Sequence, residues 1–351
     1  MKSDTILAVD LGRYKSVACA YHRTTREHTF RTIDTTPEDL GRLLARHSGS
    51  VVVIEACANA GWVHDLAVAA GHLVKVANTA AEAWKFRHLK RKTDKDDALR
   101  LAELEAIGQL PTVVLPDPAT RQRRMLIAFR SELVGRRVAA QNRIRSLFAG
   151  AGLPTPRGHR AWTATGLEGI ERQARPLAEC GPDELWRGML ALAVAEYRSA
   201  AACIAEVEAR LDELAEADPA TVLLETTPGL GRRTAEAVAA HLGDPHRFAS
   251  AKQVGAYAGL VPKQYQSGEA DRAGKITRRG PGLLRKLLVE CAWCMLRYNP
   301  WAREQYARLS GGRAGRKKPA VVALARRLLV RCWAMLRTGT PWRAEAVPAA
   351  G

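Results

Sequence analysis

The segment SVVVIEA, residues 50–56, constrains the fold more than any other stretch of this chain. Its run of β-branched and apolar residues predicts a strand, and because no polar residues alternate with them, both faces of that strand must be covered. A strand of this kind is typical of the middle of a sheet that has helices on either side. We therefore expect an α/β unit built around residues 50–56.

Strand and helix patterns alternate on both sides of this central strand. The preceding sequence predicts a hairpin, a third strand and a helix, at TILAVDL (5–11), SVACAYH (16–22), HTFRTID (28–34) and Thr36 to Arg46. The following sequence predicts a helix, a strand and a long helical region, at GWVHDLAVAAG (61–71), LVKVAN (73–78) and onward through Lys92. Thr93 can cap a new helix that begins at Asp94. The expected order is three strands, helix, strand, helix, strand, helix.

The rest of the chain has mainly helical patterns. Between Pro118 and about Ala217, the segment AEYRSAAACIAEVEARLDELAEA has apolar residues at helical spacing between charged faces. This pattern suits a long helix that pairs with another helix, as in an arm or a dimerisation element, and it is compatible with a coiled coil although short for one. We expect four regions, of which the last is a basic tail, at residues 1–117, 118–217, 218–310 and 311–351.

A glycine-containing turn lies near the start of the third region. The segment TTPGLGRRTAEAVAAHLGD places Gly229 and Gly231 between two expected helices, an arrangement similar to a helix-hairpin-helix. In such a turn, backbone N–H groups and a helix N-terminus hold a phosphate, and Arg232 and Arg233 would assist here. The alternative is an ordinary tight connection between two helices.

The charge balance indicates a polyanionic partner. Lys and Arg number 54 against 36 Asp and Glu, which gives a net charge of +18, and such an excess is typical of proteins that bind nucleic acid. A GC-rich genome would explain the total but not the clustering of the cations. We see no apolar run of roughly 18 residues, and Asp4 and Asp10 interrupt the N-terminal segment where a signal peptide would be apolar. We therefore expect a cytoplasmic protein.

Four carboxylates fall at positions where a sheet and a helix can bring them together. Asp10 ends the first expected strand, Glu55 ends the central one, and in KRKTDKDDALRLAE Asp94 and Asp97 share one helix face while Asp96 points away. Four converging carboxylates would repel each other and raise each other's pKa unless cations lay between them. Oxygen-only ligands suit Mg²⁺ or Mn²⁺, and two such ions can clamp the attacking and leaving oxygens of a phosphodiester.

Each carboxylate also has an ordinary explanation. Asp10 precedes Gly12 and could belong to a turn, Glu55 could pair with an arginine, and Asp94 and Asp97 favour the first turn of a helix through its dipole. The basic flank of the segment can hold a nucleic-acid backbone over a metal site, and its residues are Lys85, Arg87, Lys90, Arg91, Lys92 and Lys95.

These residues carry a resemblance to a known family. Asp10 in AVDLG, Glu55 in VIEAC, and Asp94 and Asp97 in TDKDDA resemble the DEDD signature of the insertion-sequence-110 family of transposases. The N-terminal part then resembles the RuvC version of the ribonuclease-H fold, and the segment from PGLG to GPGLLR resembles the family's second domain. The resemblance implies a mixed sheet with helices, a helical middle and a mainly helical C-terminal domain. It extends from residue 5 to about 300.

The resemblance also implies an activity and partners. It implies a DNA recombinase that is guided by a structured bridge RNA, that works as a dimer or tetramer, and that uses Ser267 in YQSGE as nucleophile. Judged from the residues alone, Ser267 is a loop serine before Gly268, with no histidine close in sequence. A serine hydroxyl needs an activating base or metal. Nearby cations that could offset phosphate charge are Lys263, Arg272, Lys275, Arg278 and Arg279.

Three rival functions remain open from the sequence. A hydrolytic junction nuclease would use the same carboxylates to activate water, and Ser267 would then be structural. An actin-like ATPase or sugar kinase would use VDLGRYKS as a phosphate loop, but it needs a second glycine-rich loop that we do not find. A non-catalytic nucleic-acid binder would have no need of all four carboxylates and Ser267.

Overall fold

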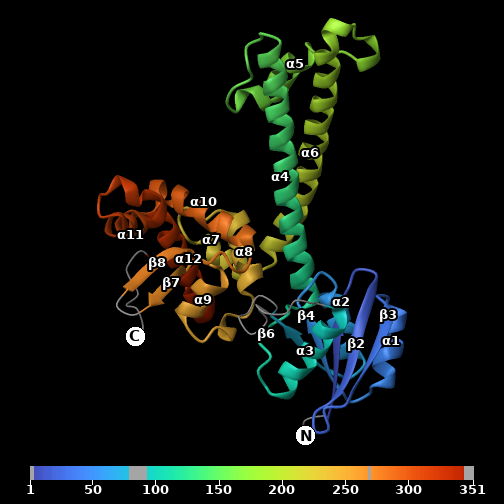
Figure 1. The fold of residues 1–351 in the computed structure, drawn as a ribbon. Helices are drawn as coiled ribbons and strands as arrows, with labels where there is room; N and C mark the ends of the chain where they lie inside the picture. Colours follow the sequence, from blue (N-terminus) through green and yellow to red (C-terminus); the bar gives the residue numbers. More distant parts are fainter. Residues whose placement is uncertain (1–3, 79–92, 268–269, 344–351) are drawn as a thin grey trace. The chain divides into compact units, whose positions relative to one another are not determined.

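The computed structural model describes residues 4–78, 93–267 and 270–343, with the backbone alone between 264 and 273 (Figure 1). The chain divides into two compact units, Met1–Arg121 and Gln122–Gly351.

The first unit is built on a mixed six-stranded sheet. Its strands lie in the order β3-β2-β1-β4-β5-β6, with β1, β4 and β5 parallel and the remaining neighbours antiparallel. Their bounds are Thr5–Asp10 (β1), Lys15–His22 (β2), His28–Asp34 (β3), Val51–Glu55 (β4), Leu73–Ala77 (β5) and Thr112–Val113 (β6). The mixed sheet expected from the sequence is confirmed. The two-residue strand β6 was not predicted, because it is too short to give a pattern.

Helices cover both faces of the sheet, which explains why the central strand is apolar throughout. Helices α1 (Pro37–Arg46) and α2 (Ala60–Ala69) pack on one face, against Val52 and Ile54 of β4. Helix α3 (Asp94–Ala106) packs on the other face, against Val51 and Val53. The expected order of strands and helices is confirmed for the described residues. The helical region expected up to Lys92 falls on residues 79–92, which lie outside them.

The second unit begins with two long helices that pack side by side (Figure 1). Helix α4 (Pro118–Gly150) and helix α6 (Leu185–Glu216) bury Ile144 and Leu190 between them, and the short helix α5 (Ala164–Glu171) lies in their connection. The ion pairs Arg130–Glu208 and Arg143–Glu196 link rising positions on α4 to falling positions on α6, so the two helices are antiparallel. The expected long paired helix is confirmed.

One segment of this pair could cross a membrane by length and composition, contrary to the expectation from the sequence. It is Pro182–Glu216, which includes α6. In this structure the apolar residues of α6 pack within the protein, because Leu190, Ala193 and Val194 are buried against α4. A single helix with these properties is also common in the cores of proteins that cross no membrane.

The C-terminal part of the second unit is mainly helical, as expected, and carries one β-hairpin. Its helices are α7 (Pro219–Glu225), α8 (Arg232–Leu242), α9 (Ala251–Tyr257), α10 (Gly282–Tyr298), α11 (Pro300–Ser310) and α12 (Lys317–Thr338). The hairpin joins β7 (Pro262–Ser267) to β8 (Ala270–Ile276). Short 3₁₀ helices occur at Arg160–Trp162, Leu177–Glu179, Pro182–Glu184, Pro245–Arg247 and Ala314–Arg316.

The expectation of a basic tail from residue 311 onward was wrong for most of its length. Residues 317–338 form α12, and its apolar side chains complete the core of the C-terminal part. The spacing that drives this is visible in the sequence at Val321, Leu324, Ala325, Leu328, Leu329 and Cys332. The dense arginines and lysines between these positions obscured the pattern.

Candidate active site

Asp10 and Glu55 end neighbouring parallel strands. The register pairs Val9 of β1 with Ile54 of β4, so the next residues, Asp10 and Glu55, lie beside each other at the carboxyl edge of the sheet. Both residues are half-buried. The backbone therefore brings together two of the four carboxylates that the sequence singled out.

A tight turn after Asp10 ties this edge to the start of α2. A Cβ atom on Gly12 would lie 2.1 Å from the carbonyl oxygen of Lys15, so only glycine fits there. The Asn59 side chain donates a hydrogen bond to the Gly12 carbonyl oxygen at 3.1 Å, and the Trp62 indole donates to the Asn59 side-chain oxygen at 3.3 Å. The loops that follow the two carboxylate-bearing strands are thus joined to each other.

The Cys57 thiol lies close to both carboxylates. Burial raises the pKa of this thiol, and the negative charges of Glu55 and Asp10 raise it further. A thiol held in its protonated form is a poor nucleophile. Cys57 therefore marks the common neighbourhood of Asp10 and Glu55 and is not an activated group.

A capping box fixes the start of α3 and divides its three aspartates by role. The Thr93 hydroxyl accepts from the backbone N–H of Asp96 at 3.3 Å, and the Asp96 carboxylate accepts from the backbone N–H and the hydroxyl of Thr93 at 3.1 and 2.6 Å. The Asp96 carboxylate is thus engaged in hydrogen bonds at the helix N-terminus. Asp94 is exposed and Asp97 is half-buried. The helix start expected at Asp94, with Thr93 as its cap, is confirmed.

A buried ion cluster holds the other end of α3. Glu105 is only 4% exposed. Its carboxylate accepts from the Arg23 guanidinium at 2.9 Å and from the Lys75 ammonium at 2.8 Å. Arg23 also donates to the backbone carbonyl oxygens of Glu105 and Ala106, at 3.2 and 3.4 Å, where the helix leaves carbonyl groups unpaired. Together with the burial of Ala98 and Leu101, the cluster fixes α3 on the sheet.

The carboxylates do not form a closed metal cluster as they stand. Within residues 4–78, 93–267 and 270–343, no three His, Cys, Asp or Glu side chains lie close enough together to hold a metal ion. Asp10, Glu55 and Asp97 each take part in another polar or electrostatic interaction within the chain. The backbone places these residues at one edge of the sheet and at the start of the helix packed on β1. Their convergence around metal ions stays a prediction.

Most of the basic flank of α3 lies outside the described residues. This holds for Lys85, Arg87, Lys90, Arg91 and Lys92. Lys95 is described and exposed, and its ammonium group lies 5.7 Å from the centre of the Phe30 ring. Contact of this flank with nucleic acid stays a prediction.

Ser267 is the last residue of β7. The sequence had suggested instead that it lies in a loop. Its backbone pairs with Ala270 at the closed end of the hairpin. For Ser267 and Arg272 the structure describes the backbone alone. The side chains of Lys263, Lys275, Arg278 and Arg279 are exposed. The difference arises because the polar sequence PKQYQS lacks the apolar alternation by which strands are recognised.

The loop that follows this hairpin is held tightly. The Arg285 guanidinium donates to the carbonyl oxygens of Ala258, Arg279 and Gly280, at 3.1, 2.9 and 3.1 Å. Gly259 has a φ of +64°, and a Cβ atom there would lie 2.1 Å from the Arg279 carbonyl oxygen. The backbone that carries Arg278 and Arg279 is thus positioned by contacts with the segment before β7.

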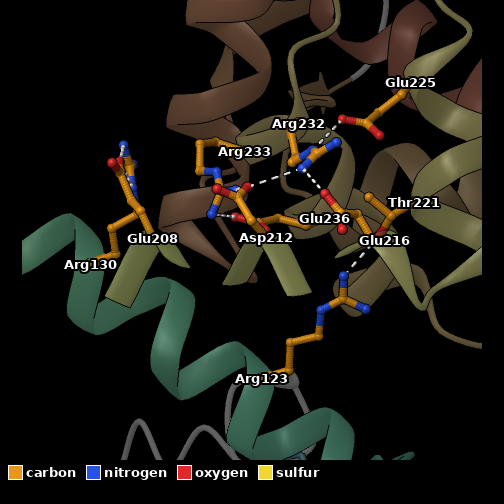
Figure 2. A network of polar contacts seen from close by, with 10 residues as sticks. All are labelled: Arg123, Arg130, Glu208, Asp212, Glu216, Thr221, Glu225, Arg232, Arg233 and Glu236. Atoms are coloured by element: carbon orange, nitrogen blue, oxygen red, sulfur yellow. Dashed lines mark hydrogen bonds and ion pairs between the residues drawn. The ribbon is translucent and has the colours of Figure 1, made fainter. Parts of the chain in front are cut away.

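The turn with Gly229 and Gly231 joins α7 to α8, as the sequence predicted, and Gly229 has a φ of +87°. Its two arginines contact protein carboxylates (Figure 2). Arg232 pairs with Glu225, Glu216 and Asp212 at 2.9, 3.0 and 3.3 Å, and Arg233 pairs with Asp212. These contacts tie α8 to α6 and α7. Phosphate binding by this turn stays a prediction.

Glu236 lies behind this network and is fully buried (Figure 2). Its carboxylate is 3.3 Å from the Arg233 guanidinium, and neither of its oxygens has a hydrogen-bond partner among the described residues. Burial raises its pKa to about 7, although Arg233, Arg123 and Arg130 act in the opposite direction. The residue borders a cavity of about 100 Å³ between α4, α8 and α10. Sequence reasoning missed it, because its partners come from distant segments.

The fold defines a class of protein. A ribonuclease-H-like mixed sheet followed by a mainly helical region is the architecture of a DEDD transposase. Residues 7–152 match a family model described as a transposase, the DEDD transposase of IS110 elements. Residues 222–307 match a second model, described as transposase IS116/IS110/IS902 family.

Known proteins align with most of the chain. A transposase for insertion sequence element IS1328 from Yersinia enterocolitica is 29% identical over 83% of this chain and 84% of its own length. A probable family 20 transposase from Pseudomonas aeruginosa is 30% identical over 70% of this chain and 71% of its own length. A transposase for element IS1111A from Coxiella burnetii is 28% identical over 70% of this chain. The chain belongs to the IS110 family of transposases, enzymes that catalyse DNA transposition.

Proposed function

We propose that this transposase cuts and rejoins DNA through a covalent phosphoserine on Ser267, with Asp10, Glu55, Asp94 and Asp97 as ligands of two divalent cations. One observation carries the proposal. The register of β1 and β4 sets Asp10 beside Glu55, and α3, which begins with Asp94 and Asp97, packs on β1. The rival kinase reading has no support from the family to which the chain belongs.

The donor set suits Mg²⁺ or Mn²⁺. All four side chains offer carboxylate oxygens, the ligands that these ions prefer. When bound, such ions would offset the charge that develops on a scissile phosphate. The Asp96 carboxylate is committed to the capping box, so we do not include it among the ligands.

The chemistry exchanges one phosphodiester for another. The Ser267 oxygen attacks the phosphorus atom, the bond to the leaving sugar oxygen breaks, and the serine proton ends on that oxygen as a new hydroxyl. In the second half, a sugar hydroxyl attacks the phosphoserine, a phosphodiester forms between DNA ends, and Ser267 recovers its proton. The number of phosphodiester bonds is unchanged, so no ATP is consumed.

The carboxylates and the serine belong to different compact units of the chain. We propose that a homo-oligomer, dimer or tetramer, assembles complete sites and that the α4–α6 pair contributes to its interface. Leu185, Met189 and Leu192 support this, because they recur at helical spacing on α6 and are 47%, 47% and 57% exposed. We further propose that a structured bridge RNA guides the enzyme to its DNA, in the bacterial cytoplasm.

The test compares the unaltered protein with Asp97→Ala and Ser267→Ala in cells that carry the element with its flanking DNA. Recombinant junctions and DNA that stays attached to denatured protein are scored. We expect both variants to lose junctions and only the unaltered protein to give an adduct. If Ser267→Ala still cuts DNA while Asp97→Ala does not, the enzyme is a hydrolytic nuclease and Ser267 is structural. Omission of the element's RNA-coding region tests the guide.

A further inference from the structure

Helices α10–α12 carry a large excess of positive charge. Residues 282–338 contain thirteen Lys and Arg against only Glu290 and Glu304, so this stretch supplies more than half of the chain's net charge of +18. Glu304 is already paired with Arg308 at 2.6 Å. The link between α11 and α12 and the first residues of α12 are exposed from residue 311 to 319, and they include Arg313, Arg316, Lys317 and Lys318. A protein surface of this charge attracts a polyanion.

Aromatic side chains face outward from the same helices. Trp293 on α10 is 44% exposed and is not part of the core of the C-terminal part. Its ring rests on Tyr306 of α11, with 6.4 Å between ring centres. Tyr306 packs in turn against the core, which gives Trp293 a firm support. Tyr298, near the end of α10, is 65% exposed.

Two arginines flank this aromatic pair. Arg297 follows Trp293 by one helical turn on α10, and the Arg303 guanidinium donates to the Arg297 carbonyl oxygen at 3.2 Å. Both arginines are exposed. A supported aromatic ring beside guanidinium groups is the combination by which proteins hold unpaired bases together with their phosphates.

We propose that the Trp293–Tyr306 face is a binding surface for single-stranded nucleic acid. One base stacks on Trp293, and Arg297 and Arg303 contact the adjacent phosphates. A duplex hides the faces of its bases, so it would meet only the charge of this surface. The inference rests on the chain's being a transposase, and it does not depend on the phosphoserine step.

The test measures binding by the full chain in EDTA, so that cleavage plays no part. Fluorescence anisotropy at fixed salt compares a labelled 12-nucleotide RNA, the matching DNA strand and the matching DNA duplex. Trp293→Ala is expected to weaken binding of single strands about tenfold and of duplex little, because one stacked base is lost. Trp293→Phe should keep most of the affinity. Phe129→Ala, at an equally exposed position on α4 (44%), should leave the binding of all three nucleic acids unchanged.

A second variant separates stacking from charge. Trp293→Lys removes the ring and adds a cation, so it tightens binding if charge alone matters and weakens single-strand binding if the base stacks. Arg297→Gln should weaken the binding of all three ligands. It should also reduce the slope of log affinity against log salt concentration by about one. Selective loss for RNA, for DNA strands or for both supports the surface and identifies its ligand. Unchanged or tighter single-strand binding by Trp293→Lys, or equal loss for the duplex, overturns the proposal.

Discussion

At the scale of single residues, Glu236 departs most from what its neighbours in sequence suggest. It lies in the run TAEAVAAHL, where an exposed glutamate would be unremarkable, yet it is 0% exposed. A buried carboxylate without hydrogen bonds favours its neutral form. Its cost to the fold therefore depends on pH.

The stability of the second unit should fall as pH rises through neutrality. The folded chain holds a proton on Glu236 with a pKa of about 7, above the ordinary 4.5. The stability that this proton contributes is complete below pH 4.5, declines as pH rises from 4.5 through 7 and is lost above that, because the unfolded chain releases the proton at a lower pH than the folded chain. Glu236→Gln should remove this decline and raise the free energy of unfolding at pH 8 by about 3 kcal/mol.

Denaturant unfolding at pH 5 and pH 8 checks this prediction. The charged groups that act on Glu236 are Arg233 on α8, Arg123 and Arg130 on α4, and Asp212 on α6. Glu216→Gln serves as control, because Glu216 is 67% exposed and also pairs with an arginine. A decline of equal size in Glu236→Gln would show that another group causes it.

Neither Glu236 nor Glu105 was foreseen as a special residue from the sequence. The partners of Glu105 are Arg23 and Lys75, which lie 82 and 30 residues away in the chain. Asp10 and Glu55 could be selected because each ends a recognisable strand. A buried ion pair leaves no comparable local pattern.

At the scale of elements, the first turn of α3 contains one aspartate that caps the helix, Asp96, and two that we propose as metal ligands, Asp94 and Asp97. The capping box that starts the helix is formed by Thr93 and Asp96. Local rules sufficed to predict this helix start, because a cap involves residues only three positions apart. The β7–β8 hairpin was not predicted, because its strands are polar and form their own two-stranded sheet.

Asp96 and Asp97 should therefore respond in opposite ways to replacement. Asp96→Ala is expected to cost about 1 kcal/mol of stability, the usual effect of losing a cap, and to retain most of the recombination activity. Asp97→Ala should abolish activity with little change in stability. Thermal unfolding and junction formation, measured on both variants, check the pair. An inactive Asp96→Ala that unfolds normally would move Asp96 into the set of metal ligands.

At the scale of the whole molecule, the two units have separate cores. The first is organised by β4, buried on both faces, and its character was evident from the sequence. The core of the C-terminal part depends on α12, which the density of basic residues concealed. The same cations that signal a nucleic-acid partner thus hid a core helix.

Leu328→Ala tests how far the second unit depends on α12. Leu328 is 0% exposed, so its truncation should cost about 2–5 kcal/mol through lost burial and the cavity left behind. Leu73→Ala is the matched control, since Leu73 is 63% exposed on β5 and should change stability by well under 1 kcal/mol. Urea unfolding of both variants measures the difference. Equal small effects would mean that α12 is dispensable to the core.

The position of α12 has a consequence for synthesis. Helix α12 follows in the chain every element against which it packs, so the ribosome must translate beyond residue 338 before that core can close. A product that stops before residue 317 keeps the whole first unit but exposes the apolar surfaces of α8 and α10. Proteases would degrade such fragments. Early termination would therefore remove the protein altogether, although the fragment still contains the four carboxylates of the first unit.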